Sequence, residues 1–201
     1  MKQKILLKIV SDGLYRYFPS NEAKDMQQKA EKEYFALCSQ HKDDPPAIKE
    51  HTEGMIYGAA ALYKVLTESG MSSEASVEMT DRIFRDFMEK QADKIRLLLK
   101  IPGLYRHIPK IFLKTVSKKY NSDSGFKLSI YDFGNDRARF DITECPYFNT
   151  CQSLGCPQLT EVFCNTDDCC YQNMHPMLQW NRTSTIGRGG SLCDFDIMVK
   201  K

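Results

Sequence analysis

The sequence predicts an α+β protein: an N-terminal helical half, followed by a four-stranded antiparallel sheet of two hairpins with connecting helices. Two observations lead to this prediction. Apolar residues recur at helical spacing over residues 1–120, whereas they alternate with polar residues beyond residue 125. Strands that follow a run of helices are typical of α+β folds. We therefore expect a helical region over 1–120 and a cysteine-rich α+β region over 121–201, together forming one compact unit.

Length and composition limit the classes of function. The chain has 201 residues, of which 42% are hydrophobic and 27% charged, so it can bury a sizeable core. Its formal net charge of +2 gives no strong attraction to nucleic acid, and we expect no nucleic-acid partner. Lys8 interrupts the N-terminal apolar run, which is too short for a signal-peptide core, and no stretch approaches the roughly 18 apolar residues of a membrane span. We expect a cytoplasmic protein.

Three helical segments are predicted before residue 102. The first follows Pro19-Ser20-Asn21, the second runs from Pro45-Pro46 to Gly70, and the third is capped by Ser72-Ser73 and ends near Pro102-Gly103. Each segment has one apolar face. In the first helix this face consists of Ala23, Met26, Ala30, Tyr34 and Leu37, and in the second of Ile48, Met55, Ile56, Ala59, Leu62, Tyr63 and Leu66.

The stretch from Arg96 to Lys119 is basic and amphipathic. It carries seven Lys and Arg residues and no acidic residue, interleaved with leucine, isoleucine, phenylalanine and valine. Such a stretch could make weak contact with an anionic membrane surface. The alternative, which we favour here, is a helix packed on the domain with a solvated basic face, because helical apolar stripes usually face a core.

The strands follow a predicted linker at Asn121–Gly125. In the first hairpin, Phe126, Leu128 and Ile130 alternate with polar residues, residues 134–136 form the turn, and Ala138, Phe140 and Ile142 alternate on the return strand. A helical stretch is broken at residues 155–157, where Pro157 opens the next helix. In the second hairpin one face carries Leu178, Trp180, Arg182, Ser184 and Ile186, residues 187–190 turn the chain, and Cys193, Phe195, Ile197 and Val199 return.

The helix after Pro157 carries a candidate reactive group. Cys164, Asp167 or Asp168, Tyr171 and His175 share one helical face if the helix runs that far. A thiol, a carboxylate and an imidazole are the parts of an activated nucleophile, to which a residue from the sheet would contribute. The alternatives are that Cys164 packs as a small hydrophobic residue and that His175 caps the helix end.

Seven of the eight cysteines lie between Cys145 and Cys193. Without an export signal we expect reduced thiols, which points to catalysis or metal binding. No Cys-x-x-Cys spacing occurs, although Cys145, Cys151, Cys156 and Cys164 could gather around zinc or an iron–sulfur cluster. Our first expectation is that the protein needs no metal and no cofactor. Arg182 could bind the carboxylate of an acidic ligand, or be a surface residue of a strand.

Five short motifs occur in one order in the last third of the chain. They are Asp141–Tyr147 (DITECPY), Gly155–Leu159 (GCPQL), Phe163–Asp167 (FCNTD) followed by Tyr171 and His175-Pro176, Arg182–Thr185 (RTST) and Gly190–Phe195 (GSLCDF). This series resembles the L-2-amino-thiazoline-4-carboxylic acid hydrolase-like family, with Gln158 where glutamate is usual. The basic stretch before the sheet is also similar to that of the family.

The resemblance implies a reaction of cysteine metabolism on a small-molecule substrate. Water adds to the carbon between sulfur and nitrogen of a cyclic isothiourea, sulfur leaves, and N-carbamoyl-L-cysteine forms. It implies catalytic roles for Cys145, Cys164 or Cys193 as a thiolate, or for a water activated by Asp167 and His175. Arg182, Thr185 and Tyr171 would bind substrate, although strand parity places Arg182 and Thr185 on opposite faces unless a bulge intervenes.

A second resemblance leads to another class of function. The ending Gly190–Phe195 is also similar to that of vinyl-4-reductase-type ligand-binding domains. It implies a non-catalytic sensor that binds a small molecule between sheet and helices. The sequence predicts no oligomeric state.

Overall fold

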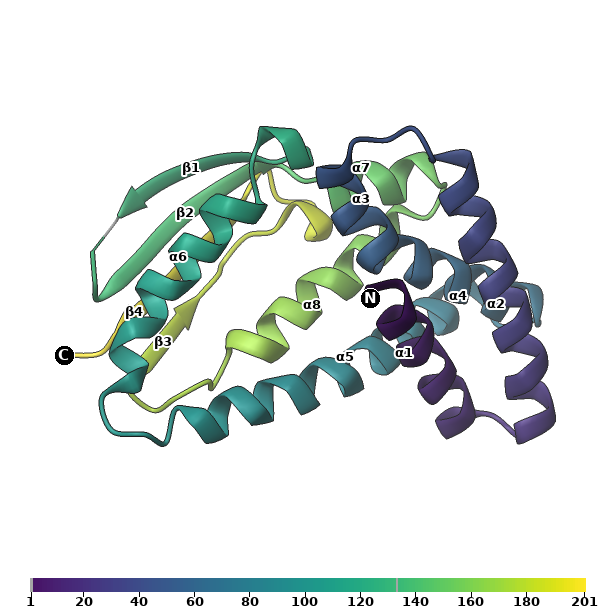
Figure 1. Cartoon of the computed structure of the whole chain (residues 1–201), viewed down its shortest axis with the longest axis horizontal. Coiled ribbons are helices and arrows are strands. Elements are labelled where there is room, and N and C mark those ends of the chain that lie inside the picture. Colours follow the sequence, from purple (N-terminus) through teal and green to yellow (C-terminus); the bar gives the residue numbers. More distant parts are fainter. Residues whose placement is uncertain (1, 133) are drawn as a thin grey trace. The chain divides into compact units, whose positions relative to one another are not determined.

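A computed structural model describes residues 2–132 and 134–201 of the chain (Figure 1). Helices α1 to α6 precede a four-stranded antiparallel sheet, and α7 and α8 connect its hairpins, so the predicted α+β class is confirmed. The helices are α1 (Lys2–Tyr17), α2 (Ser20–Gln40), α3 (Pro46–His51), α4 (Tyr57–Glu68), α5 (Ser73–Leu98), α6 (Ile108–Lys119), α7 (Pro146–Ser153) and α8 (Thr160–Tyr171). The strands are β1 (Lys127–Asp132), β2 (Arg137–Glu144), β3 (Leu178–Asn181) and β4 (Cys193–Val199).

The chain forms two compact units. Unit 1 contains the residues up to 87 together with 147–163, and unit 2 contains 88–146 together with 164–201. The chain passes from one unit to the other inside α5 and inside α8, and returns to unit 1 between Pro146 and Tyr147. No helix among the described residues is long and apolar enough to cross a membrane.

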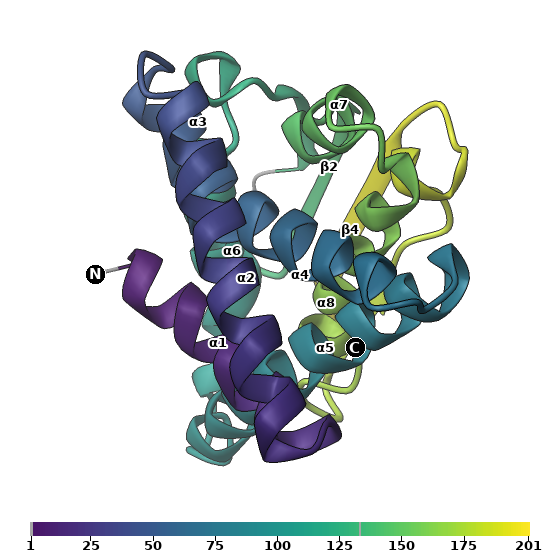
Figure 2. The same cartoon turned by 90° about the vertical axis from the view of Figure 1, so that its right-hand side faces the viewer.

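Unit 1 is helical, and its core follows from the apolar faces of its helices. α2 contacts α1 and α4 (Figure 1 and Figure 2). The buried residues of α2 are the five predicted from helical spacing. A Cβ on Gly58 would lie 2.5 Å from Leu6 Cγ, and one on Gly13 would lie 2.4 Å from Ile83 Cγ2, so both glycines allow a close approach that alanine would prevent.

The predicted helix from residue 46 to Gly70 contains one irregularity. A π-helical turn, Thr52–Ile56, separates α3 from α4. Tyr34 donates a hydrogen bond to the carbonyl of Glu53 in this turn at 2.9 Å. The side chain therefore supplies a partner to a helix segment whose backbone hydrogen bonds are shifted from the α pattern.

Unit 2 is built around the sheet, whose strand order is β1-β2-β4-β3 with every neighbour antiparallel. The register pairs Phe140 with Phe195 and Ile142 with Cys193, which places these four buried side chains on one face. α6 contacts β2 and β4 and buries Phe112 and other apolar residues. One core is thus formed by the apolar residues at helical spacing on α6 and the alternating apolar residues on the strands. The exposed lysines of α6 lie outside this core.

Three segments differ from the expectation. The predicted linker at residues 121–125 is an ordered turn, in which the side chains of Asn121 and Ser124 each accept a hydrogen bond from the other residue's backbone N–H. Helix α8 ends at Tyr171, and Asn173 takes a left-handed conformation with φ 58°. Strand β3 ends at Asn181, so the predicted face of the second hairpin stops before Arg182.

Asp194 explains the early end of β3. Its carboxylate accepts hydrogen bonds from the backbone N–H groups of Thr183 and Ser184, at 2.9 and 2.6 Å, and from the Thr183 hydroxyl at 2.6 Å. Backbone groups that bond to a side chain are not available to a strand ladder. The segment therefore leaves the sheet and passes into the 3₁₀ turn Ile186–Arg188.

Candidate functional site

A pocket of about 200 Å³ lies in unit 2, between α6, the sheet and α8. Its apolar walls come from Phe112 and Val116 of α6, Phe140 and Ile142 of β2, and Phe195 of β4. Its polar lining residues are Thr115 and Lys119 of α6, Tyr120, and Asp167 and Tyr171 of α8. A mostly apolar and aromatic cavity with a few polar groups is typical of a small-molecule site.

Local periodicity explains why these side chains converge. Asp167 and Tyr171 are four residues apart on α8, as are Phe112 and Val116 on α6, so each pair lies on one side of its helix. Aromatic contacts hold the walls in place. The Phe112 ring packs edge-on against Tyr171, with centroids 4.8 Å apart, and the Phe140 ring stacks on Phe195 at 4.9 Å.

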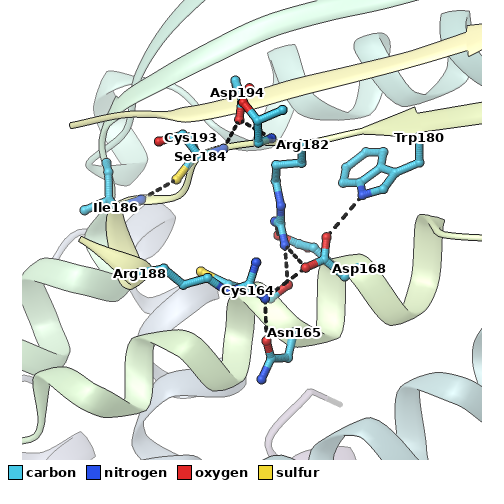
Figure 3. Close-up of polar contacts among 12 residues, drawn as sticks. Cys164, Asn165, Asp168, Trp180, Arg182, Ser184, Ile186, Arg188, Cys193 and Asp194 are labelled. Atoms are coloured by element: carbon cyan, nitrogen blue, oxygen red, sulfur yellow. Dashed lines mark hydrogen bonds and ion pairs between the residues drawn. The ribbon is translucent and has the colours of Figure 1, made fainter. Parts of the chain in front are cut away.

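Arg182 joins the segment after β3 to α8 (Figure 3). Its side chain is only 1% exposed. Nη1 lies 3.1 Å from Asp167 Oδ2, and Nη2 lies 2.6 Å from Asp168 Oδ2 and 2.6 Å from the Cys164 carbonyl. A guanidinium has five donors in a fixed fork, which suits three acceptors on consecutive turns of one helix. Its charge is thus compensated by two carboxylates.

Asp168 is held by further donors. Trp180 Nε1 donates to Asp168 Oδ1 at 3.1 Å, and Arg188 Nη2 lies 3.0 Å from Asp168 Oδ2 and 2.6 Å from Asn165 Oδ1 (Figure 3). Burial of Asp168 opposes ionisation, but the charge of Arg182 and the hydrogen bonds from Arg182, Trp180 and Arg188 outweigh it and lower the pKa of this carboxyl. Asp168 is therefore ionised at neutral pH.

Asp167 has the opposite character. Burial raises the pKa of its carboxyl to about 6, and the charge of Asp168 adds to this effect, while Arg182 partly offsets it. The side chain is 38% exposed and lines the pocket, so this exposed part faces a concave, apolar-walled space. Two adjacent carboxyls whose pKa values are pushed apart are characteristic of acid–base sites. A carboxylate with a pKa near 6 can accept a proton at neutral pH.

Cys164 and Cys193 lie beside this pair and are both buried. Burial raises the pKa of the Cys164 thiol above its ordinary value, and the nearby Thr185 hydroxyl and Arg182 only partly offset this. Burial also raises the pKa of Cys193 to about 11, although its Sγ accepts a hydrogen bond from the Ile186 N–H at 3.2 Å. Both groups are therefore neutral thiols at pH 7.

Comparison with known proteins identifies the family. The sequence model of the family described as L-2-amino-thiazoline-4-carboxylic acid hydrolase matches residues 49–197. The chain belongs to this family. The match begins inside α3, includes α4 to α8 and strands β1 to β3, and ends inside β4. The resemblance seen in the five motifs of the last third is thereby confirmed.

Other comparisons add little. No curated protein matches the chain. Among solved structures, a crystal structure of an H-NOX protein from S. oneidensis in the Fe(II)NO ligation state is similar with a TM-score of 0.31 and 15% sequence identity, over 90% of this chain and 97% of that one. At this level of similarity it supports no statement about function.

The structure brings together most of the residues predicted for the hydrolase-family site. Three of them, Cys164, Asp167 and Tyr171, lie along α8. The other three, Arg182, Thr185 and Cys193, lie near Cys164, since Arg182 and Thr185 lower the pKa of the Cys164 thiol and Cys164 influences the pKa of Cys193. Thr185 is buried, and within the described residues its hydroxyl makes no well-formed hydrogen bond. The departure from β3 after Asn181 removes the strand parity that would have kept Arg182 and Thr185 on opposite faces.

Two predicted residues lie elsewhere. The shared helical face stops at Tyr171, because α8 ends there, and His175 lies beyond it. The His175 ring stacks on Tyr105 with centroids 4.5 Å apart, and Nδ1 accepts a hydrogen bond from the Met177 N–H at 3.1 Å. Cys145 is half-buried between β2 and α7. Neither His175 nor Cys145 lines the pocket.

The alternative of a four-cysteine metal site gains no support from the arrangement. Among the residues that the structure describes, no three His, Cys, Asp or Glu side chains are grouped so that they could hold a metal ion.

Some residues of the site were not predicted. Phe112, Thr115 and Lys119 of α6 line the pocket, although the sequence assigned this helix to the core with a solvated basic face. Arg188, which the sequence did not single out, and Asp168, which it offered as the alternative to Asp167, complete the charge cluster around Arg182. Helical spacing named both Asp167 and Asp168, but nothing local predicts which of two neighbouring carboxylates faces a cavity.

Proposed function

We propose that the pocket of unit 2 hydrolyses a small cyclic isothiourea or amidine, with L-2-amino-thiazoline-4-carboxylate as the first candidate. One observation carries this proposal: Asp167, whose carboxyl has a pKa of about 6, lines a small aromatic pocket in a chain of this hydrolase family. The pocket volume of about 200 Å³ suits a five-membered ring with few substituents.

Charge complementarity supports an orientation for such a ligand. Arg182 bonds to Oδ2 of Asp167, so Oδ1 is the oxygen that can face the cationic isothiourea group. Lys119 lines the same pocket and can attract the ligand carboxylate. The aromatic rings of Phe112 and Phe140 would pack against the heterocycle. In this arrangement Arg182 positions Asp167 and does not itself bind the carboxylate, in contrast to the role expected from the sequence.

The proposed reaction needs one water molecule. Water oxygen bonds to the carbon between sulfur and nitrogen of the protonated ring while Asp167 accepts one proton. The carbon–sulfur bond then breaks, the second water proton passes to the leaving sulfur, and N-carbamoyl-L-cysteine is released. Asp167 finally returns its proton to solvent. A group with a pKa near the working pH is well suited to accept and release a proton in one cycle.

The thiols favour this water route over covalent catalysis. A cysteine attacks as its thiolate, and nucleophilic cysteines have lowered pKa values. The pKa values of Cys164 and Cys193 are raised by burial. We assign these thiols to packing around Arg182 and Thr185. Neither Cys145 nor His175 lines the pocket, and the Cys145→Ser substitution described below tests the catalytic role predicted for Cys145.

The test is release of thiol from L-2-amino-thiazoline-4-carboxylate by catalytic amounts of the purified chain. Ring opening liberates one thiol per turnover, so release must exceed the eight cysteines of the protein itself. Asp167→Asn is the site variant, and Asp123→Asn, in an exposed position outside the pocket, is the matched control. Equal turnover by Asp167→Asn and the wild type would contradict the proposal.

The aromatic lining also favours a second candidate, a ligand-binding protein without turnover. Five of the ten lining residues are aromatic, and such a pocket can bind a ligand by packing alone. Calorimetry with the same compound separates the two functions. Stoichiometric binding that Asp167→Asn weakens, with no thiol released, would support the sensor and exclude the hydrolase for this compound. Release of thiol would exclude the sensor.

A further inference from the structure

An exposed surface of unit 2 combines apolar and basic side chains. Its apolar part consists of Leu97, Leu98 and Ile101, at the end of α5 and in the following turn, and Ile111 of α6, which are 64%, 57%, 55% and 53% exposed. A single exposed apolar side chain is ordinary on a soluble protein, whereas several within fifteen residues indicate a contact surface.

The fold holds these side chains outward. Leu99 is buried in a cluster with Met174 and Leu178, which fixes the turn after α5. On α6, Phe112 and Val116 face the core, so Ile111 lies on the opposite side. The end of α5, the connecting turn and the start of α6 follow one another at one end of unit 2, at the lower left of Figure 1.

The basic part of this surface is only weakly neutralised within the protein, by the charge of Asp136 that acts on Arg106. Lys100, Arg106, Lys110 and Lys114 are exposed, and no acidic residue occurs between Asp93 and Asp123. Among the residues that the structure describes, these four form no ion pair. Arg96 is different, because Glu89 and Asp93 bind it, and it does not belong to the surface.

We propose that this surface, the exposed side chains of residues 97–114, docks on an anionic membrane surface. Leucine and isoleucine side chains beside lysines are the composition of segments that lie in the interface plane. The lysines would meet lipid phosphates and carboxylates while the apolar side chains enter the boundary with the acyl chains. Nucleic acid fits less well, since the four exposed apolar side chains have no partner on a phosphate backbone. The proposal is independent of the hydrolase reaction.

Sedimentation with vesicles tests the proposal on the full chain. Vesicles of phosphatidylcholine with and without 30% phosphatidylserine are compared at low salt and at 0.5 M NaCl. We expect binding to the anionic vesicles at low salt and little binding in the other conditions, because salt screens exposed charges. Lack of binding to anionic vesicles, or equal binding to neutral ones, would overturn the proposal.

Two variants and a control locate the contact. Lys110→Gln/Lys114→Gln should lower the partition coefficient about 25-fold, at about fivefold for each basic residue near the membrane. Leu97→Ser/Leu98→Ser should lower the partition coefficient about tenfold, although this variant retains all of the lysines. Lys24→Gln/Lys32→Gln removes the same charge from exposed positions of α2 in unit 1 and should change binding less than about twofold. An equal loss in this control would contradict docking through residues 97–114.

The same variants exclude other occupants. The surface would be assigned to nucleic acid if the protein bound a single-stranded oligonucleotide but no vesicles, and if Leu97→Ser/Leu98→Ser left the oligonucleotide binding unchanged. A dimer in solution that the same variant converts to a monomer would assign it to a second copy of the chain. Circular dichroism melting checks that every variant is folded, which we expect because all substituted side chains are exposed.

Discussion

Arg182 Nη1 lies 3.1 Å from Asp167 Oδ2, and the guanidinium that makes this contact is almost entirely buried. The same group binds Asp168 and the Cys164 carbonyl, so one side chain joins the loop after β3 to α8. The contact with Arg182 holds the Asp167 carboxyl, whose pKa is raised, at the pocket and fixes its orientation. Stability and the proposed chemistry therefore depend on the same contact.

Arg182→Met should destabilise the protein by about 3 kcal/mol, because it removes the buried cation between two neighbouring carboxylates and leaves Asp168 with Arg188 alone. Arg188→Met is the matched control. Arg188 binds the same Asp168 but its side chain is 39% exposed, so the loss should be below about 1 kcal/mol. Urea unfolding measures both values. Equal destabilisation by the two substitutions would show that burial of Arg182 does not matter.

The pH dependence of turnover should follow Asp167. Only the ionised carboxylate accepts a proton, so kcat/KM should rise through about pH 6 and level off above pH 7. Asp167→Asn should lower turnover at least 100-fold and remove this rise. Asp168→Asn is the comparison, because the pKa of Asp168 is lowered and it stays ionised in this range. A rise near pH 6 that persists in Asp167→Asn would assign it to another group.

Stability should depend on pH in the direction set by the raised pKa of Asp167. Between about pH 4 and pH 6 the folded state binds a proton at Asp167 that the unfolded state releases, so this group lowers stability as the pH rises through that window. Asp167→Asn should therefore be more stable than the wild type above pH 6, by about 1 kcal/mol after allowance for the exposed part of the side chain. The difference should vanish near pH 4 in urea unfolding series.

Asp168 and Asp194 act in the opposite sense. Their pKa values are lowered in the folded state, because ion pairs and hydrogen bonds outweigh the effect of burial. Their contributions are present above the ordinary pKa of a carboxyl and are lost as the pH falls below it. A wild-type stability that kept rising below pH 4 would contradict both assignments.

The thiols of the site should be slow to react. Because burial raises the pKa values of Cys164 and Cys193, alkylation by iodoacetamide at pH 7.5 should leave both unmodified for much longer than the same cysteines in urea. Cys164→Ser, Cys193→Ser and Cys145→Ser should each keep turnover within about tenfold of the wild type. A loss of more than about 100-fold in one of them, with the protein folded, would restore the covalent route.

A bulky residue at the pocket should block substrate. Thr115→Phe adds a ring at an exposed position of α6 that lines the pocket, so KM should rise at least tenfold with little loss of stability. Ser117→Phe adds the same ring to the same helix outside the pocket lining. Thiol release measured over a range of substrate concentrations compares the two. Similar KM values for both variants would place the substrate elsewhere.

Local periodicity in the sequence was sufficient for most of the fold. The spacing of Ala23, Met26, Ala30, Tyr34 and Leu37 predicts the buried face of α2, and the alternation through Phe140 and Phe195 predicts the buried face of the sheet. Such patterns predict buried faces because a helix or strand in a folded domain needs one apolar face. The residues of that face recur at a fixed spacing within a short segment of the sequence. The order of the five motifs likewise indicates the family from the sequence alone, and the family match confirms it.

The site itself was decided by contacts between distant residues. Asp194 draws Thr183 and Ser184 out of the sheet, which ends β3 and frees Arg182 to reach α8. His175, expected beside the thiol, follows the end of α8 and stacks on Tyr105 instead. Asp167 and Asp168 are equivalent in the sequence, and only their different surroundings separate their pKa values.

The sequence by itself therefore determined the fold class, the buried faces and the family, because these depend on patterns that span a few turns or strands. Only the tertiary structure decided which carboxyl faces the pocket, which cation binds it and which helix supplies the remaining wall. Burial and electrostatic interactions depend on the distances between groups that folding brings together. The positions of these groups along the chain do not predict those distances.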